Sequence, residues 1–220
     1  MPPTLRTPRR RDSLNLLAHA LIAHASLADH QGQELCGALM ADFFGGQSLD
    51  DYPAGVVAGI RQHRLVDAFT DRHPAFVACR RLLAGDGAPR FASGILVDLF
   101  WDYVLGSRWD LYGETRSGLK LPAFCGLVHL ALERSEAWRS PQFARVAPWM
   151  INDQWLAAYA TKRGIAAALH GLSRRLPHGA ALSGCETLLI RHETALAAGF
   201  ADFWPQLEKA IIATPQTRED

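Results

Sequence analysis

Lysine is scarce in this chain, and the sequence has neither a dominant sign of charge nor a long apolar run. Three lysines and 20 arginines stand against 22 acidic residues, which gives a formal net charge of +1. This balance excludes a protein that binds nucleic acid through bulk positive charge. No stretch approaches the about 18 consecutive apolar residues that a membrane span needs, so no membrane partner is expected. The arginine excess suits carboxylates and phosphates, although a GC-rich genome would produce the same bias.

Cysteine is also sparse and scattered. The four cysteines are Cys36, Cys79, Cys125 and Cys185, with no CxxC pair and no metal-ligand spacing. This pattern excludes a disulfide scaffold and a thiolate zinc site. We expect small buried thiols in a reducing compartment.

The N-terminal segment superficially looks like a secretory signal, because a basic stretch precedes an apolar one. His19 and His24 interrupt the apolar stretch, and no small-residue cleavage site ends it. We therefore interpret residues 1–12 as a flexible basic arm and the following segment as a domain helix. The protein is predicted to be cytoplasmic.

No convincing alternation of apolar and polar residues is present, so β-strands are not expected. Apolar residues recur at helical spacing almost throughout, and 49% of the chain is hydrophobic, enough for a sizeable core. The predicted helices are 14–28, 33–44, one from 50–53 to just before Pro74, 91–106, 122–137, 142–160, 164–174 and 179–212, the last kinked near Pro205. The chain is predicted to be all-α, with one domain of about eight helices over 13–213 and a tail at 214–220.

Polar residues recur along one side of the third predicted helix. His63, Asp67 and Asp71 are four residues apart, so at about 100° per residue they share a face, with Arg64 beside them. Taken alone, this pattern is also that of the solvated side of an ordinary amphipathic helix.

The stretch GILVDLFWDYVL, residues 94–105, makes a metal site more plausible. Apolar residues surround this helix on nearly all sides, which is typical of a buried helix. Asp98 and Asp102 nevertheless lie on one line of it, and each unpaired buried carboxylate would cost about several kcal/mol. Either arginines neutralise them, or the line reaches solvent, or they hold a divalent cation with imidazole ligands.

Two earlier helices contribute similar groups. His19 shares a helix face with Asn15, and Asp42 lies near a helix C-terminus, where the helix dipole disfavours an anion. A lone aspartate would be weak evidence. Four helices that each offer an acid or an imidazole are better evidence for a metal site.

The order of these motifs resembles the acyl carrier protein phosphodiesterase family. The matching stretches are NLLAHALIA (15–23), GALMADF (37–43), HRLVDAFTDRHP (63–74), DLFWDYVL (98–105), NDQWLAAYA (152–160), GLSRRLP (171–177) and the terminal FADFWPQLEKAI. Each motif is short, but together they cover about residues 14–212. Two positions depart from the family pattern: Ala38 where an asparagine is frequent, and Gly45 where a basic residue is usual.

The resemblance implies a hydrolase that removes 4′-phosphopantetheine from the serine of holo acyl carrier protein and releases the apo-protein. It also implies an all-helical fold distantly similar to the His-Asp (HD) metal-dependent phosphohydrolases, with Mn²⁺ or Mg²⁺ as cofactor. The family's site residues fall on His19, Asp42, His63, Arg64, Asp67, Asp71, Asp98 and Asp102.

The expected metal ligands are Asp42, His63 and Asp67, with one or both of Asp98 and Asp102. A divalent metal there would polarise the phosphodiester and lower the pKa of a bound water. Ligation rich in oxygen favours Mn²⁺ or Mg²⁺ over zinc.

The remaining roles stay open between alternatives. Asp71 or Asp102 would take the proton of the attacking water. Arg64 would bind a phosphate oxygen, because a guanidinium matches that geometry. His19 is either a further ligand or the acid that protonates the departing serine oxygen.

Carrier proteins of this kind are small, helical and acidic, so docking is expected on a basic surface. The candidate residues are Arg61, Arg72, Arg80, Arg81 and Arg90. No nucleic-acid partner is expected, and the sequence leaves the oligomeric state open.

Two other functions remain alternatives. One is an HD-type metal phosphohydrolase that acts on nucleotides or alarmones, since such a site needs no glycine-rich phosphate loop. The other is a non-catalytic module that binds carrier proteins, which the departures at Ala38 and Gly45 would favour.

Overall fold

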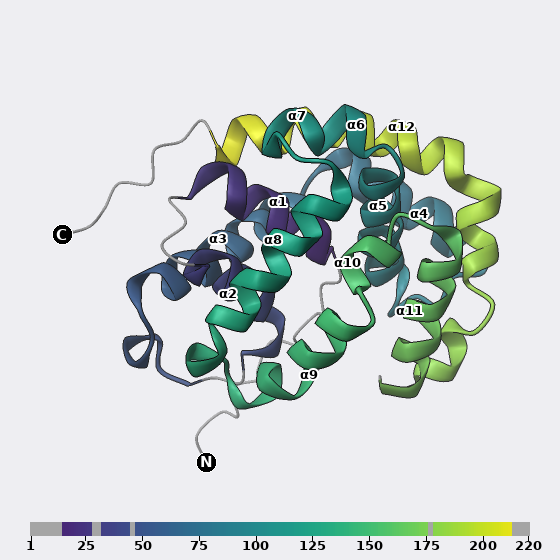
Figure 1. Cartoon of the computed structure of the whole chain (residues 1–220). Helices are drawn as coiled ribbons and strands as arrows, with labels where there is room; N and C mark the ends of the chain where they lie inside the picture. Colours follow the sequence, from purple (N-terminus) through teal and green to yellow (C-terminus); the bar gives the residue numbers. More distant parts are fainter. Residues whose placement is uncertain (1–14, 28–31, 45–46, 176–177, 213–220) are drawn as a thin grey trace, which may run out of the picture.

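All regular structure in the described part of the chain is helical (Figure 1). The computed structural model describes residues 15–27, 32–44, 47–175 and 178–212. The all-α prediction is confirmed for these ranges. The predicted arm at 1–12 and the predicted tail at 214–220 lie outside the described residues, so the proposed domain limits stay a prediction.

The helices follow one another with short connections. The longer ones are α1 (Leu16–Ser26), α2 (Gln33–Met40), α3 (Ala54–Thr70), α4 (Pro74–Gly85), α5 (Ser93–Ser107), α8 (Leu121–Arg134), α9 (Pro141–Asn152), α11 (Lys162–Arg175) and α12 (Glu186–Ile211). Single turns form α6 (Trp109–Tyr112), α7 (Glu114–Ser117) and α10 (Trp155–Ala158), and 3₁₀ turns form η1 (Ala41–Phe43), η2 (Leu49–Asp51), η3 (Glu136–Trp138) and η4 (Gly179–Leu182).

Helix α4 was not predicted from the sequence, because its N-terminus lacks the usual capping residues. The Nδ1 atom of His73 accepts a hydrogen bond from the Ala75 N–H at 3.3 Å, and Pro74 occupies the first helical position. Serine, threonine, aspartate and asparagine are the residues that normally cap a helix start. Because a histidine caps it, the sequence pattern did not indicate the helix that begins at Pro74, shortly after α3 ends.

Two other helices were predicted to be longer than they are. The range 142–160 is two helices, because Gln154 adopts a left-handed conformation (φ 49°) between α9 and α10. The range 179–212 begins with the 3₁₀ turn η4, and α12 starts only at Glu186.

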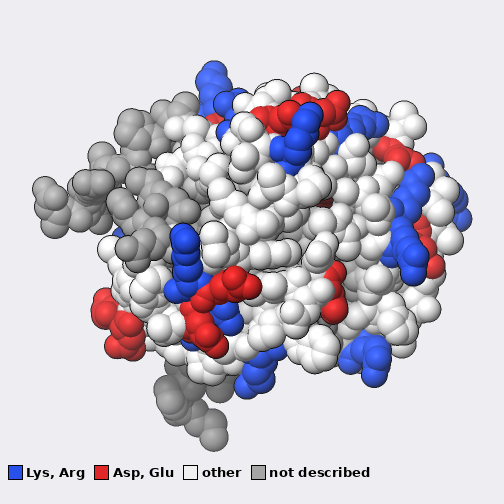
Figure 2. Space-filling view, in the orientation of Figure 1, with Lys and Arg blue, Asp and Glu red and all other residues white. Residues whose placement is uncertain are grey.

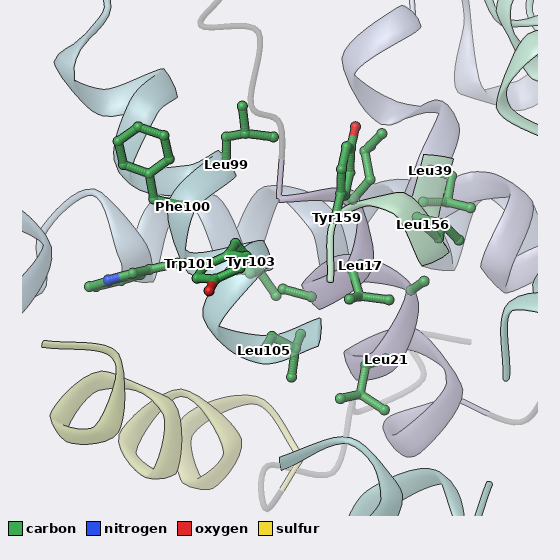
Figure 3. Packing of buried hydrophobic residues seen from close by; sticks show 14 of the residues in the cluster. Leu17, Leu21, Leu39, Leu99, Phe100, Trp101, Tyr103, Leu105, Leu156 and Tyr159 are labelled. Atoms are coloured by element: carbon green, nitrogen blue, oxygen red, sulfur yellow. The ribbon is translucent and has the colours of Figure 1, made fainter. Parts of the chain in front are cut away.

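Helix α5 lies at the centre of the core. It packs against α1, α4, α11 and α12, and α12 runs along one edge of the molecule in Figure 1. Leu99, Phe100 and Leu105 are fully buried, as the apolar character of this helix predicted. Figure 3 shows these side chains beside those of α1 and α10. Burial of each large apolar side chain contributes about 1.5–3 kcal/mol.

Helices α2 and α3 cross with their backbones in contact. A Cβ atom on Gly37 would lie 2.1 Å from the Val56 carbonyl oxygen, and one on Gly59 would lie 2.1 Å from the Glu34 carbonyl oxygen. No larger residue fits at either position without moving a helix. The close crossing brings η1, which follows α2, next to the middle of α3.

In the part of the chain that the structure describes, no helix combines the length and the apolar character required to cross a membrane.

Candidate metal centre

Four side chains from three elements meet beside the crossing of α2 and α3. The Nε2 atom of His63 lies 3.3 Å from an oxygen of Asp42 and 3.2 Å from an oxygen of Asp67. The other oxygen of Asp67 lies 3.2 Å from the Nε2 atom of His19. The structure therefore brings together α1, η1 and α3 at one point, as the polar pattern of the sequence predicted.

The ring of His63 is held in one orientation by the backbone of α2. Its Nδ1 atom lies 2.7 Å from the carbonyl oxygen of Ala38. Because a carbonyl can only accept, Nδ1 carries the hydrogen, and the Nε2 atom faces the carboxylates. This Nε2 atom is buried and has no hydrogen-bond partner among the described residues.

His19 lies flat against His63. The two ring centroids are 3.6 Å apart, and the ring planes differ by 12°. His19 is fully buried, whereas the side chain of Asp67, which both rings contact, is 34% exposed. The cluster is therefore closed on the α1 side and open on the side of α3 that carries Asp67.

Two carboxylates beside His63 require a positive charge between them. Burial lowers the pKa of His63, but Asp42 and Asp67 raise it more strongly, to about 10. Burial raises the pKa of Asp67, but the hydrogen bond with His19 and the close contact with His63 hold it far below its usual range. Burial and the neighbouring His63 lower the pKa of His19. A proton or a metal ion can supply the required charge.

Asp98 adds a further carboxylate to these surroundings from α5. It is partly buried, and burial raises its pKa. The nearby charges of Asp67, Asp42 and Asp71 raise this pKa further. Because these acids and Asp102 all raise the pKa of Asp98, a nearby cation would stabilise its charged form.

The donor atoms fit a divalent cation. One donor atom from each of His19, His63 and Asp67 lies within 4.8 Å of the others. The second oxygen of Asp42 is buried without a hydrogen-bond partner among the described residues. Imidazole nitrogens with several carboxylate oxygens, and no thiolate, suit Mn²⁺ better than a structural zinc ion.

The structure does not bring Asp102 into this cluster. Its two oxygens accept hydrogen bonds from the backbone N–H groups of Leu17 and Ala18, at 2.8 and 2.9 Å. These N–H groups belong to the first turn of α1 and have no partner within that helix. Asp102 is fully buried and caps α1, which carries His19. This position differs from the predicted roles as metal ligand and proton acceptor.

The predicted acid–base and phosphate-binding residues of α3 lie at the open side. Asp71 directly follows α3 and is exposed. Arg61, Arg64 and Arg72 are exposed as well, and none of them forms an ion pair with an acid in the described part of the chain. The Nε atom of Arg72 donates to the Ala68 carbonyl at 2.8 Å.

The other predicted docking arginines lie apart from α3. Arg80 and Arg81 belong to α4, and Arg90 follows it. Arg80 is partly buried, with its guanidinium 5.9 Å from the ring centre of Phe76. Arg81 and Arg90 are exposed.

Two features of the site were missed from the sequence. The Ala38 carbonyl orients His63, and Gly37 with Gly59 allows that contact. Every residue has a backbone carbonyl, so the residue type does not show that the Ala38 carbonyl accepts this hydrogen bond. The two glycines inside helical segments were the available signal, because a helix interior disfavours glycine by about 1 kcal/mol unless packing requires it.

Comparison with known proteins agrees with the motif order. The family model described as "Acyl carrier protein phosphodiesterase" matches residues 14–207. A protein of that name from Photorhabdus laumondii is 37% identical over 198 residues, 90% of this chain and 95% of the relative. Proteins of the same name from Serratia proteamaculans and Yersinia pestis are each 32% identical, covering 84% and 88% of this chain and 94% and 95% of the relatives. No solved structure matches.

The family match covers far more than half of the chain, and the relatives align along nearly their whole length. The resemblance inferred from the short motifs is therefore confirmed. The chain belongs to the acyl carrier protein phosphodiesterase family.

Proposed function

We propose that this chain hydrolyses the phosphodiester of holo acyl carrier protein and releases 4′-phosphopantetheine and the apo-protein. The relatives carry the name of this activity, and membership of the family makes the chain a phosphodiester hydrolase. The observation that carries the proposal is the Nε2 atom of His63. It is held between Asp42 and Asp67 by the bond from Nδ1 to Ala38.

We further propose that His19, Asp42, His63, Asp67 and Asp98 hold Mn²⁺ or Mg²⁺. A bound divalent ion polarises a phosphodiester oxygen and lowers the pKa of water. The full burial of His19 supports its role as a ligand, because a serine oxygen on a protein substrate cannot approach it. Asp102, with both oxygens bonded to α1, is left out of this ligand set.

Exposed residues of α3 and of the turn that follows it act on the substrate. The exposed position of Asp71 and its proximity to Asp98 support a role as acceptor of the proton from the attacking water. The guanidinium of Arg64 binds a phosphate oxygen and thereby orients the phosphodiester. In the reaction the water oxygen bonds to phosphorus, the bond between phosphorus and the serine oxygen breaks, and the serine oxygen takes up a proton.

We place the protein in the cytoplasm. All four cysteines are free and buried, which is consistent with a reducing compartment.

The experiment is the intact mass of holo acyl carrier protein after incubation with this protein and Mn²⁺, with and without EDTA. We expect loss of one phosphopantetheine that EDTA prevents. The Asp110→Asn variant changes an exposed acid on α6, outside the proposed site, and should behave like the wild type. An unchanged carrier mass in the presence of Mn²⁺ would contradict the proposal.

A further inference from the structure

The open side of the cluster fixes the direction from which a substrate arrives. Asp67 is 34% exposed, whereas the side chains of Asp42, His63 and His19 are 9%, 2% and 0% exposed. Asp71, one turn beyond Asp67, is also exposed. A phosphodiester on the surface of a protein therefore reaches the cluster beside the C-terminal half of α3.

The surface next to this opening is basic and apolar. Arg61, Leu65 and Ala68 follow one another along one face of α3, and Arg72 comes two residues after the helix ends. Arg64 lies between that face and Asp67. Leu65 is 52% exposed, which is high for a leucine. In the described part of the chain, the three arginines have no acidic partner.

This face borders an open groove of about 480 Å³ between α3, the start of α4 and the end of α12. Leu65, Ala68, Phe69 and Arg72 line it on the α3 side, and Gln206 and Ile211 line it on the α12 side. Most of the lining is apolar. The bond from Arg72 Nε to the Ala68 carbonyl keeps the guanidinium close to α3, and the Gln206 amide is bonded to Asp202.

Another face also exposes apolar residues, but it does not combine them with a cationic surface. Leu130 of α8 and Trp149 of α9 are 45% and 63% exposed. Figure 2 shows that face with a broad uncharged middle and with basic and acidic side chains intermingled around it. Apolar exposure, proximity to the cluster and arginines without an acidic partner among the described residues coincide at one surface. We call it the α3–α12 surface and define it as Arg61, Arg64, Leu65, Arg72 and the groove.

We propose that the carrier protein docks on the α3–α12 surface, with an acidic face against Arg61 and Arg72 and an apolar side chain in the groove. This inference rests on the proposed function. The phosphate accounts for Arg64, but the distal part of the prosthetic group is a neutral amide chain. It gives no reason for Arg61 and Arg72, which have no acidic partner among the described residues. A negatively charged protein face with an apolar residue at its centre matches both the charge and the groove.

The test is the substitution Leu65→Glu, which places an acid at the centre of the surface without touching the cluster. The control is Leu130→Glu, which changes a leucine of similar exposure on α8. We would measure kcat and KM on holo acyl carrier protein, together with Mn²⁺ affinity by electron paramagnetic resonance. Leu65→Glu should raise KM by about tenfold or more, because an apolar anchor is lost and charge repulsion is added. Its kcat and Mn²⁺ affinity should stay within about twofold of the wild type.

Three outcomes would overturn the proposal. One is an unchanged KM for Leu65→Glu, and another is an equal rise in KM for Leu130→Glu. A third is a wild-type dimer that Leu65→Glu dissociates, which would assign the groove to a second copy of the chain. A wild-type protein that leaves the holo carrier intact would instead contradict the proposed function, and the docking proposal with it.

Discussion

Asp98 and Asp102 lie one turn apart on the same buried helix, yet their surroundings differ. Burial raises the pKa of both carboxyl groups. The nearby charges of Asp67, Asp42 and Asp71 raise the pKa of Asp98 further. The oxygens of Asp102 accept two N–H groups from the start of α1. Asp98 and Asp102 thus differ in their surroundings: Asp98 lies near the acids of the proposed metal site, and Asp102 accepts hydrogen bonds from a helix N-terminus.

The cluster around His63 and the cap at Asp102 therefore have different roles: the first is chemical and the second is structural. The cluster around His63 has a buried nitrogen and a buried oxygen without hydrogen-bond partners among the described residues, and it opens to solvent at Asp67. The cap at Asp102 has both oxygens bonded and no exposed surface. Because α1 carries His19 directly after the capped turn, Asp102 positions His19 in the cluster around His63.

The largest expected effect comes from Asp67→Asn. This substitution removes the charge that contacts both histidines, so kcat/KM on holo acyl carrier protein should fall by about 10³-fold or more. The melting temperature should change by only a few degrees, because Asp67 is partly exposed. Activity assays and circular dichroism check both parts, and full activity in the variant would refute the metal assignment.

Asp102→Ala should instead act on stability. It leaves the N–H groups of Leu17 and Ala18 buried without partners, which costs about 2–4 kcal/mol in the free energy of unfolding. Urea denaturation measures this loss. Asp110→Ala, at an exposed site, should change the free energy by less than about 0.5 kcal/mol. Equal stability of the two variants would show that the cap is unimportant.

Gly59→Ala should have an intermediate effect. The added Cβ meets the Glu34 carbonyl at 2.1 Å, and α2 and α3 must separate to admit it. We expect a loss of about 1–3 kcal/mol and weaker binding of Mn²⁺, because the Ala38 carbonyl moves away from His63.

The matched control for the helix crossing is Gly126→Ala on α8. A Cβ atom there has no neighbour within 4 Å. This variant should gain up to about 1 kcal/mol from the higher helix propensity of alanine. The helix-crossing explanation fails if both variants gain stability.

The smallest expected effect is a pH dependence of the metal-free protein. The folded-state pKa of His63 is about 10, above the unfolded value of 6.5. Its contribution to the free energy of unfolding is therefore complete below pH 6.5 and is lost as the pH rises toward 10. In EDTA, the melting temperature should fall over that interval, and His63→Gln should flatten the decline. A wild-type melting temperature constant from pH 6.5 to 9.5 would contradict this explanation.

The fold class followed from the sequence because apolar spacing is a local property. The buried helix over 94–105 was recognised from its apolar residues on all sides, and α5 occupies residues Ser93–Ser107. Helix α4 was missed because a histidine caps it. The range 142–160 was drawn as one helix because the left-handed turn at Gln154 has no glycine to mark it.

The candidate site followed from the sequence only in part. Helical spacing placed His63 with Asp67, and the first two predicted helices offered His19 and Asp42. The family resemblance assigned all four to one site, and the structure brings them to the same point. Spacing could not separate the surroundings of Asp98 from those of Asp102. That difference depends on where α1 begins relative to α5, which is a tertiary contact between residues about 85 positions apart.

The central claim is that the cluster around His63, with Asp98, binds the metal and that Asp102 does not. The most direct measurement is a Mn²⁺ titration by electron paramagnetic resonance on the wild type, Asp98→Asn and Asp102→Asn at a temperature where all three are folded. We predict that Asp98→Asn weakens Mn²⁺ binding by about 10-fold or more and that Asp102→Asn leaves it within a few-fold of the wild type. The reverse order of affinities would contradict the account.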